Sequence, residues 1–375
     1  MSSVDFLIIG SGIAGASLAY ELAPHGSVLV CEQEDRHGYH TTGRSAAIYI
    51  ESYGAAPLRR LTAASRAFFD SPPEGFCDYP LLSPRGCMNI ASEAQRPALE
   101  TLKAEISATG SAFETLDGEA ARALVPILKP EAVVEAVYEP NAADIDVGAL
   151  HQGFLKLSRA RGAELRLDAA VEALERQSRG WRVRLASGEV IAARIVVNAA
   201  GAWADRIARL AGARPLGLIP MRRTIVLLDP PPGAEIAAWP AVIDADEEYY
   251  FKPEAGMILA SPADETPSEP LDAAPDELDI AICVDRLQHV AELPVRRVAR
   301  SWAGLRTFAP DRVPVFGYAP RTEGFFWYAG QGGYGMQIAP AAARLGAALA
   351  LGQAVPADIL DRGLVAQDVS PARFG

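Results

Sequence analysis

The 375-residue sequence predicts an α/β protein, α+β overall, with two domains. Patterns of strand, glycine turn and helix occur near both ends of the chain, at residues 4–32 and 325–350. Between them, residues 220–307 read as short alternating strands separated by proline-rich loops, which is typical of a mostly antiparallel sheet. The length also exceeds that of one typical domain, at about 150 residues per domain.

Composition and charge exclude several classes of protein. Half of the residues are hydrophobic, and the net charge of −12 disfavours nucleic acid and anionic membrane surfaces as partners. The apolar runs are shorter than the ~20 residues of a membrane span. The four cysteines and five histidines lack metal-ligand spacing. We therefore expect a cytoplasmic protein with reduced thiols and no protein-bound metal.

The first motif is VDFLIIGSGIAGASLAYELAPHGSVLVCE, in which a buried parallel strand precedes a G-x-G-x-x-G turn and a helix. Gly10 allows the tight turn, Gly12 lets the backbone approach a diphosphate, and Gly15 lets the helix lie close to the strand. Glu32 follows the second strand, where a carboxylate can accept hydrogen bonds from both hydroxyls of an adenosine ribose. The motif predicts a dinucleotide site at the positive N-terminal end of this helix.

The later elements follow from residue patterns in chain order. Residues 38–47, GYHTTGRSAA, predict a loop that winds into a helix beginning near Arg44. Further helices are expected over 57–69, 94–109, 278–290 and from a cap at 144–146 to 161, and strands over 81–90, 171–174, 181–185 and 190–198.

The order of these segments predicts two interleaved domains. The dinucleotide-binding domain is expected to comprise residues 1–78, 140–220 and 307–375. The second domain, expected over 79–139 and 221–306, would be mostly antiparallel with flanking helices.

Two later motifs predict chemistry. Gly332, Gly333 and Gly335 precede an alanine-rich helix, so free backbone amides would face a bound group; a plain flexible loop is the alternative. In the strand WAGLR, Gly304 and Arg306 share one face by the two-residue period. An arginine in a partly apolar site favours a carboxylate, which accepts two parallel N–H bonds; a structural salt bridge is the alternative.

Together, GYHTTGRSAA, LTAASRAFFD, PLLSPR, ADID, ALHQG, NAAGAW, RPLGLIP, WAGLR and GFFW resemble the D-amino-acid oxidase superfamily of flavoproteins, and most of all its bacterial FAD-dependent D-arginine dehydrogenases. The resemblance runs nearly end to end. It implies a Rossmann-type domain that holds FAD, with the isoalloxazine ring between the domains. Sarcosine oxidases of this superfamily hold the flavin covalently through a cysteine in the region that corresponds to residues 307–320, where this sequence has none, so the resemblance implies noncovalent FAD. The implied cofactor contacts are Gly10, Gly12, Ile13, Ala14, Gly15, Glu32, Gln33, Thr42, Gly43, Arg44, Ser45, Ala46, Val171, Ala200, Gly201, Trp203, Gly304, Gly332, Gly333, Tyr334, Gly335, Met336 and Gln337.

The resemblance also assigns a substrate site. It implies that Arg222, Tyr250 and Arg306 hold the substrate carboxylate and that Tyr53 covers the substrate. Adjacent strand residues point to opposite faces, so at most one of Arg222 and Arg223 enters the pocket, and the resemblance selects Arg222. Core packing is the alternative for each tyrosine, above all for Tyr249. The implied pocket for the substrate side chain is Ile48, Ile50, Cys87, Tyr249 and Gly333.

Departures from the arginine-preferring relatives bear on the substrate. Cys87 stands where those relatives have an acidic residue, Ile48 replaces a histidine and Ile50 replaces a threonine. A buried guanidinium without a carboxylate partner is unfavourable by several kcal/mol, and Glu51, on the same loop, is the one alternative partner. We therefore expect apolar or mid-sized D-amino acids to be favoured over D-arginine.

The expected reaction is hydride transfer from the substrate Cα to flavin N5, giving an imino acid that hydrolyses to a 2-oxo acid and ammonium. Oxidation of a secondary amine, such as sarcosine or a proline-like ring, or of a 2-hydroxy acid is the alternative. The expected electron acceptor is oxygen or a quinone-type carrier, and a quinone would bring the protein to a membrane surface without an integral span.

Overall fold

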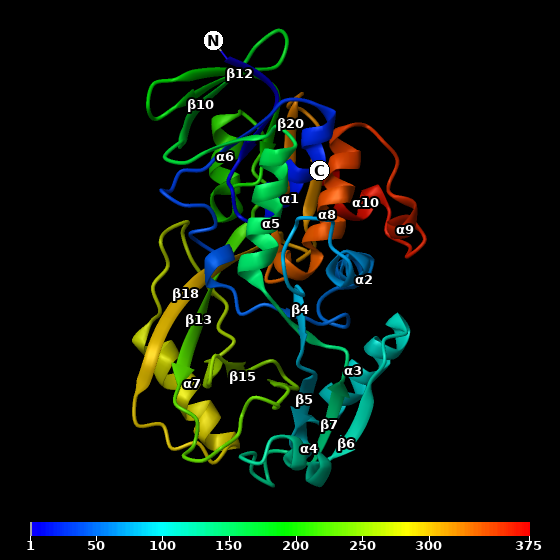
Figure 1. The fold of residues 1–375 in the computed structure, drawn as a ribbon, viewed down its shortest axis with the longest axis vertical. Coiled ribbons are helices and arrows are strands. Elements are labelled where there is room, and N and C mark those ends of the chain that lie inside the picture. Colours follow the sequence, from blue (N-terminus) through cyan, green and yellow to red (C-terminus); the bar gives the residue numbers. More distant parts are fainter. Residues whose placement is uncertain (1) are drawn as a thin grey trace.

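A computed structural model describes residues 2–375 of the chain. The molecule is elongated, with one half built on an eight-stranded sheet and the other on a ten-stranded sheet (Figure 1). Three further strands form a small separate sheet. The predicted fold class, α/β with a mostly antiparallel second sheet, is confirmed.

The first sheet is parallel at its centre. Strand β1 (Ser2–Ile9) lies between β2 (Val28–Cys31) and β12 (Val190–Asn198), and β12 also pairs in parallel with β20 (Phe325–Ala329). Residues 6–9 are buried on both faces, as expected for a central parallel strand. The outer strands are β9 (Glu164–Arg166), β10 (Val171–Arg176), β11 (Trp181–Leu185) and β19 (Val315–Tyr318).

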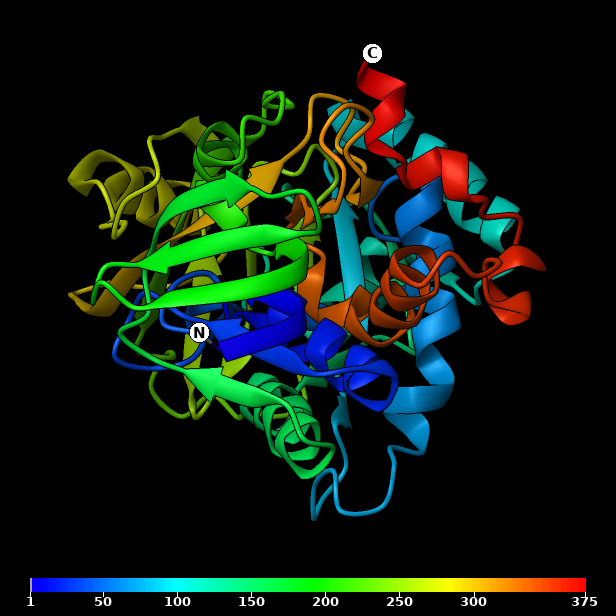
Figure 2. The same ribbon diagram turned by 90° about the horizontal axis from the view of Figure 1, so that it is seen from above.

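Helices cover both faces of this sheet. On one face, α1 (Ile13–Leu22) and α8 (Gly335–Ala350) pack through Leu18 and Ile338 against Ile8 and Phe326. On the other face, α6 (Ala204–Leu210) packs against Leu7. Helix α5 (Val147–Ala160) lies beside α1, and Figure 2 shows these layers from above.

The second sheet carries one wall of the site. Its strands are, in spatial order, β21 (Gln331–Gly332), β18 (Val298–Phe308), β13 (Ile219–Leu228), β16 (Met257–Ser261), β15 (Tyr250–Glu254), β14 (Ala241–Asp244), β5 (Cys87–Ala91), β7 (Glu135–Glu139) and β6 (Glu114–Asp117), with β17 (Thr266–Pro267) beside β13. All neighbours are antiparallel except β14 and β5. Helices α3 (Arg96–Thr109), α4 (Gly118–Leu124) and α7 (Glu277–Val290) flank this sheet.

The small sheet was not predicted. It joins β3 (Ile48–Tyr49), β8 (Ala143–Ile145) and β4 (Leu82–Pro84). The strand expected over 81–90 is split between two sheets, because Gly86 turns the chain at φ +72° and the amides of Arg85 and Gly86 both donate to Ala142 O. One predicted strand therefore becomes β4 and β5.

The prediction of a helix that begins near Arg44 is wrong. Residues Thr42–Arg44 form a single 3-10 turn, and the chain is extended again at Ser45 (ψ 137°). The carbonyl of Arg44, which a helix would need, instead accepts a hydrogen bond from Trp302 Nε1 at 3.1 Å. Contacts with β18 therefore override the local pattern.

The other predicted helices are present as α2 (Ala56–Asp70), α3, α5 and α7. The two short helices near the C-terminus, α9 (Ala357–Leu360) and α10 (Ala366–Val369), were not predicted. The segments expected for the dinucleotide domain supply every strand of the first sheet. The second sheet takes β21 from beyond residue 307, so the chain crosses between the halves again near its end.

Candidate active site

A cavity of about 680 Å³ lies between the two large sheets. Its walls include the carboxyl ends of β1, β2 and β12, the edge at which α/β sheets bind ligands. The opposite walls come from β13, β15, β18 and the turn at 329–337. The volume is within the usual range for cofactor and ligand sites.

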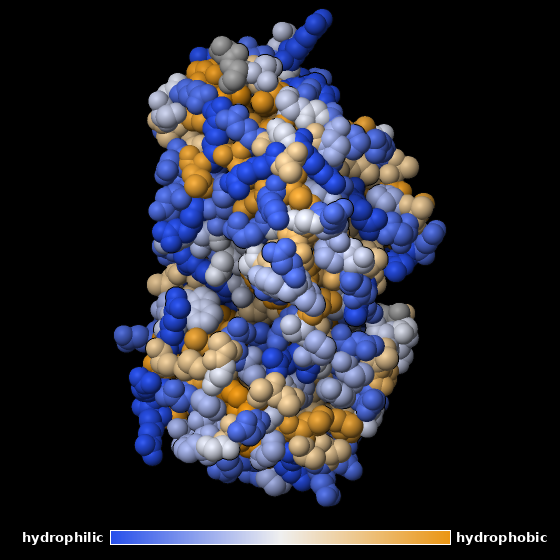
Figure 3. Space-filling view, in the orientation of Figure 1, coloured by the Kyte–Doolittle hydropathy of each residue, from blue (hydrophilic) through white to orange (hydrophobic). Residues whose placement is uncertain are grey.

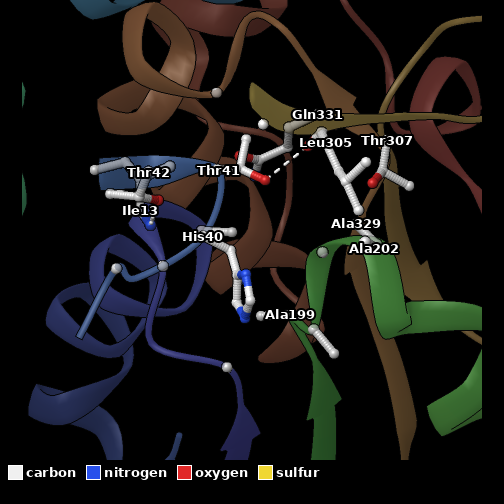
Figure 4. Close-up of a pocket in the computed structure, with 18 of the residues that line it drawn as sticks. Ile13, His40, Thr41, Thr42, Ala199, Ala202, Leu305, Thr307, Ala329 and Gln331 are labelled. Carbon is white, nitrogen blue, oxygen red and sulfur yellow. Dashed lines mark hydrogen bonds between the residues drawn. The ribbon is translucent and has the colours of Figure 1, made fainter. Parts of the chain in front are cut away.

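The glycine turn opens one end of this cavity. A Cβ at Gly15 would lie 1.9 Å from Gly10 O, so this glycine is needed for the close packing of helix and strand. Gly10 has φ +100°, which favours glycine. The backbone of Gly12 lines the cavity, and Thr42 Oγ1 accepts a hydrogen bond from Ile13 N at 2.9 Å at the start of α1 (Figure 4). A hydroxyl and helix amides thus face the same end of the cavity.

Glu32 lines the cavity and belongs to a hydrogen-bond network. Its Oε2 accepts hydrogen bonds from the amide and the hydroxyl of Ser11, both at 2.8 Å. His37 Nδ1 lies 2.8 Å from Ser11 Oγ, and Arg159 donates to His37 Nε2 at 3.1 Å. Since a guanidinium only donates, the His37 proton lies on Nδ1. Burial, and then Arg159, lower the pKa of His37, which favours this neutral form.

The loop of residues 41–44 is tied to the second sheet. Thr41 Oγ1 donates to Leu305 O at 2.6 Å, which is the dashed line in Figure 4. The guanidinium of Arg44 donates to Ala273 O at 2.8 Å and forms an ion pair with Asp272. Arg44 lines the cavity, but its guanidinium is held by Asp272 and the carbonyl of Ala273 and so links the two halves of the molecule.

The register of β13 and β18 decides which arginines enter the cavity. Arg223 pairs with Gly304 and Met221 pairs with Arg306, so Arg223 and Arg306 lie on one face of the sheet. Both line the cavity. The resemblance had selected Arg222 instead, and that expectation is wrong.

The alternation of the strand turns Arg222 to the opposite face, toward α7. Its Nη2 lies 2.8 Å from Asp279 Oδ2 and 3.7 Å from Asp276 Oδ2. The acidic side chains on and before α7 therefore hold this arginine outside the cavity. The signal that could have selected Arg223 is its pairing with Gly304 in WAGLR, which only the tertiary structure gives.

The two arginines of the cavity differ in charge balance. Arg223 donates to Asp264 O at 2.8 Å and pairs with Glu265 at 3.3 Å. Arg306 donates to Tyr53 Oη at 3.2 Å, and in residues 2–375 no carboxylate forms an ion pair with it. Burial lowers the pKa of Arg306, but Tyr53 and Tyr250 raise it overall, so the guanidinium stays charged.

Isoleucines wall the other side of the cavity. Ile48, Ile50 and Ile243 line it, and Ile243 pairs with Tyr250 across β14 and β15. Sequence reasoning missed Ile243, because nothing before the strand pairing connects it to Tyr250. Glu51 does not line the cavity and instead accepts a hydrogen bond from Tyr49 Oη at 2.9 Å.

Several predicted site residues do not line the cavity. Cys87 lies behind Ile50 in an apolar cluster, where burial raises its pKa well above the ordinary value. Tyr249 packs in the core of the second sheet, on the face opposite to Tyr250. Tyr334 packs against Tyr53 with ring centres 4.9 Å apart and the ring planes tilted by 53°. Gly15 packs against Gly10, and the amide of Gly43 donates to Gly38 O and closes the loop. Gly15, Gly43 and Arg222 also lie outside the cavity.

The remaining predicted residues do line the cavity together: Gly10, Gly12, Ile13, Ala14, Glu32, Gln33, Thr42, Arg44, Ser45, Ala46, Ile48, Ile50, Tyr53, Val171, Ala200, Gly201, Trp203, Tyr250, Gly304, Arg306, Gly332, Gly333, Gly335, Met336 and Gln337. His40, Thr41, Arg223 and Ile243 line it as well and were not predicted.

Within residues 2–375, no group of three or more His, Cys, Asp or Glu side chains is arranged to hold a metal ion. No helix in this part of the chain has the length and hydrophobicity needed to cross a bilayer. The face in Figure 3 is largely hydrophilic, with small separate groups of hydrophobic residues.

Comparisons with known proteins agree with this arrangement. Residues 5–349 match the family model described as FAD dependent oxidoreductase. The chain is 25% identical to hydrogen cyanide synthase subunit HcnC of Pseudomonas aeruginosa (86% of each protein covered) and 24% identical to glycine oxidase of Geobacillus kaustophilus (98% of this chain, 95% of the relative).

Two solved structures share the fold. The crystal structure of the Geobacillus kaustophilus glycine oxidase matches with a TM-score of 0.83 at 23% identity, over 94% of this chain and 96% of the other. The L-α-glycerophosphate oxidase of Mycoplasma pneumoniae with FAD bound also matches with a TM-score of 0.83, at 19% identity, over 94% and 95%. With its glycine turn, its Glu32 and a family match over nearly all of its length, the chain belongs to the family of FAD-dependent oxidoreductases.

Proposed function

We propose that this FAD-dependent oxidoreductase oxidises D-amino acids with apolar or mid-sized side chains. The observation that carries the proposal is Arg306, a charged guanidinium that lines the cavity without a carboxylate partner among the described residues, while isoleucines line another part of the wall. FAD, when bound, supplies the acceptor for the hydride of the substrate Cα. The chain's own residues supply orientation.

The residues of the first sheet fit the cofactor. Gly12 and the first amides of α1 would hold the diphosphate, because helix amides and the helix dipole favour an anion. Glu32, fixed by Ser11, would accept the ribose hydroxyls. The glycine turn at 332–335 and the start of α8 would lie against the flavin. We propose that the FAD is held noncovalently.

Charge balance favours a substrate with one carboxylate. Arg223 has the backbone carbonyl of Asp264 and the carboxylate of Glu265 as partners, and Glu265 also pairs with Arg312 at 2.7 Å, so part of the charge of Arg223 is balanced within the protein. Arg306 has a phenol as its hydrogen-bond partner, which leaves one positive charge for one carboxylate. A planar carboxylate can accept two parallel N–H bonds from this guanidinium, and the hydroxyls of Tyr53 and Tyr250 lie on the same cavity.

The apolar wall argues against D-arginine as the preferred substrate. Ile48, Ile50 and Ile243 offer no acceptor for a guanidinium, and Glu51 is turned toward Tyr49. A buried cation without a partner loses its hydration and gains nothing in return. The preference for the D enantiomer rests on the family resemblance. A carboxylate anchored at Arg306 would fix which face of the substrate Cα is presented to the flavin, so only one enantiomer would react well.

The test is anaerobic mixing of the holoenzyme with a panel of substrates while flavin absorbance is followed. D-leucine, D-methionine and D-phenylalanine are expected to bleach the flavin faster than D-arginine and their L enantiomers. Faster bleaching by D-arginine would refute the preference. Bleaching only by sarcosine, a proline-like ring or a 2-hydroxy acid would replace the proposed reaction with the alternative one.

A further inference from the structure

One loop connects the substrate site to a buried acid outside it. The loop of residues 50–54 follows β3 and precedes α2, and two of its side chains, Ile50 and Tyr53, line the cavity. Ile50 N donates to Gln337 Oε1 at 3.3 Å, and Tyr53 Oη accepts from Arg306. The position of this loop therefore sets how Tyr53 meets Arg306.

Ser52 anchors the loop to the second sheet. Its hydroxyl donates to Glu139 Oε1 at 2.7 Å, and both residues are buried, at 5% and 4% exposure. Glu139 is the last residue of β7 and pairs with Cys87 of β5. No arginine or lysine in residues 2–375 forms an ion pair with Glu139, although the residue is one of few buried acids.

The groups around Glu139 favour its neutral form. Burial, together with the charge of Glu51 on the same loop, raises the pKa of Glu139 to about 7, against the opposing effects of Ser52 and of Arg59 on α2. Cys87, on the neighbouring strand, is a neutral thiol because burial raises its pKa well above the ordinary value. A serine hydroxyl can accept from a carboxylic acid or donate to a carboxylate, so Ser52 partners either form. The ionised form, however, places a charge in a poorly solvated site.

We propose that Glu139 is a positioning residue: while its carboxyl is neutral, the buried contact with Ser52 keeps the loop 50–54 closed with Tyr53 on Arg306, and ionisation favours an open loop in which water can solvate the carboxylate. This inference rests on the proposed role of Arg306 as the carboxylate anchor. Tyr53 touches the substrate site, whereas Glu139 acts through Ser52.

The sign of the pH effect follows from linkage. The closed form raises the pKa of Glu139 above its ordinary value of 4.5, so the closed form binds the proton more tightly than the open form. The contribution of Glu139 to closure is complete below that ordinary value and is lost as the pH rises through about 7. Ligand affinity should weaken in the same window.

The probe is 4-methylpentanoate, a carboxylate with the carbon skeleton of leucine and no amine, whose charge is constant from pH 6 to 9. Its Kd for the oxidised holoenzyme is measured from the change in flavin absorbance. For the wild-type enzyme, log Kd should rise between pH 6 and 7 with a slope below one per pH unit and level off above pH 7, because Glu139 is then ionised in both forms. In Glu139→Gln, which keeps a hydrogen bond to Ser52 but cannot ionise, Kd should not follow this rise.

Two further variants complete the design. Ser52→Ala removes the tether and should give weak binding without the rise, which also serves if Glu139→Gln does not fold. Glu51→Gln is the matched control, since it removes a neighbouring charge but leaves Glu139 and Ser52; it should keep the rise, with the upper end shifted to lower pH because Glu51 raises the pKa of Glu139. An identical pH dependence in wild type, Glu139→Gln and Ser52→Ala would overturn the proposal.

Hydrogen exchange of the peptide spanning residues 50–54 gives a readout that needs no ligand. In the wild-type holoenzyme, protection corrected for the intrinsic rate should fall as the pH rises from about 5 to 7 and then level off, and in Glu139→Gln it should not fall. Unchanged protection in the wild type would overturn the proposal. If 4-methylpentanoate binds at no pH but protection changes as expected, the carboxylate role of Arg306 fails while the Glu139 latch stands.

Discussion

The contact between Gly333 and Arg306 gives the sharpest test of the site. A Cβ built at Gly333 would lie 1.8 Å from Arg306 Nη2 and 2.2 Å from Cζ, whereas real Cβ contacts essentially never fall below 3.0 Å. The φ of Gly333 is not in the left-handed region, so alanine fits the backbone there. The methyl group of Gly333→Ala must therefore displace the guanidinium, and the fold should survive.

The magnitude follows from that displacement. The guanidinium must move by roughly 1 Å, and a misplacement of about 1 Å in a positioning group can cost on the order of 100-fold in rate. We expect kcat/KM for the best D-amino acid to fall by about that factor, since alignment and affinity are both lost. Steady-state kinetics and anaerobic flavin reduction measure the loss.

Two controls separate this effect from a general one. Gly148→Ala, in α5, adds a methyl group whose nearest neighbour is Asp146 Oδ1 at 3.4 Å, and it should leave kcat/KM unchanged. In an Arg306→Met background, Gly333→Ala should add little, because the group it displaces is gone. An undiminished kcat/KM in Gly333→Ala, or a full 100-fold loss in the Arg306→Met background, would refute the reasoning.

Three further predictions concern charge, cofactor and thiols. Arg306→Met should raise KM and slow flavin reduction, whereas Arg222→Met should leave KM unchanged but lower Tm, because Asp279 loses its partner; equal KM values would contradict this. Glu32→Ala should weaken FAD binding at least tenfold, because a hydrogen bond to a charged group contributes about 1.5–3 kcal/mol. A fluorescence titration of the apoprotein with FAD measures this loss. Of the four cysteines, only the partly exposed Cys77 should react with a thiol reagent at pH 8, since burial raises the pKa of Cys31 and Cys283 to about 12.

Local sequence patterns correctly predicted the first strands of the parallel sheet and the glycine turn that follows β1. The strand, glycine turn and helix of residues 4–32 depend on neighbours in the chain, and Gly10, Gly12 and Glu32 all lie on the cavity as expected. The helices α2, α3, α5 and α7 were predicted for the same reason, because helix caps and periodicity are local properties. Residues 42–44 form a 3-10 turn and not the predicted helix, because Trp302, which is distant in sequence, donates a hydrogen bond to the carbonyl of Arg44.

The sequence by itself determined the strand, glycine turn and helix of a dinucleotide-binding half, and it predicted that Arg306 of β18 enters the cavity, as the structure shows. Only the tertiary structure decided which arginine of β13 joins it, since strand alternation allows either residue and the acids of α7 select the face of Arg222. It likewise brought Ile243 beside Tyr250 and removed Cys87 and Tyr249 from the cavity. The physical reason is that strand register and sheet order are set by contacts between residues distant in the chain, which no local pattern contains.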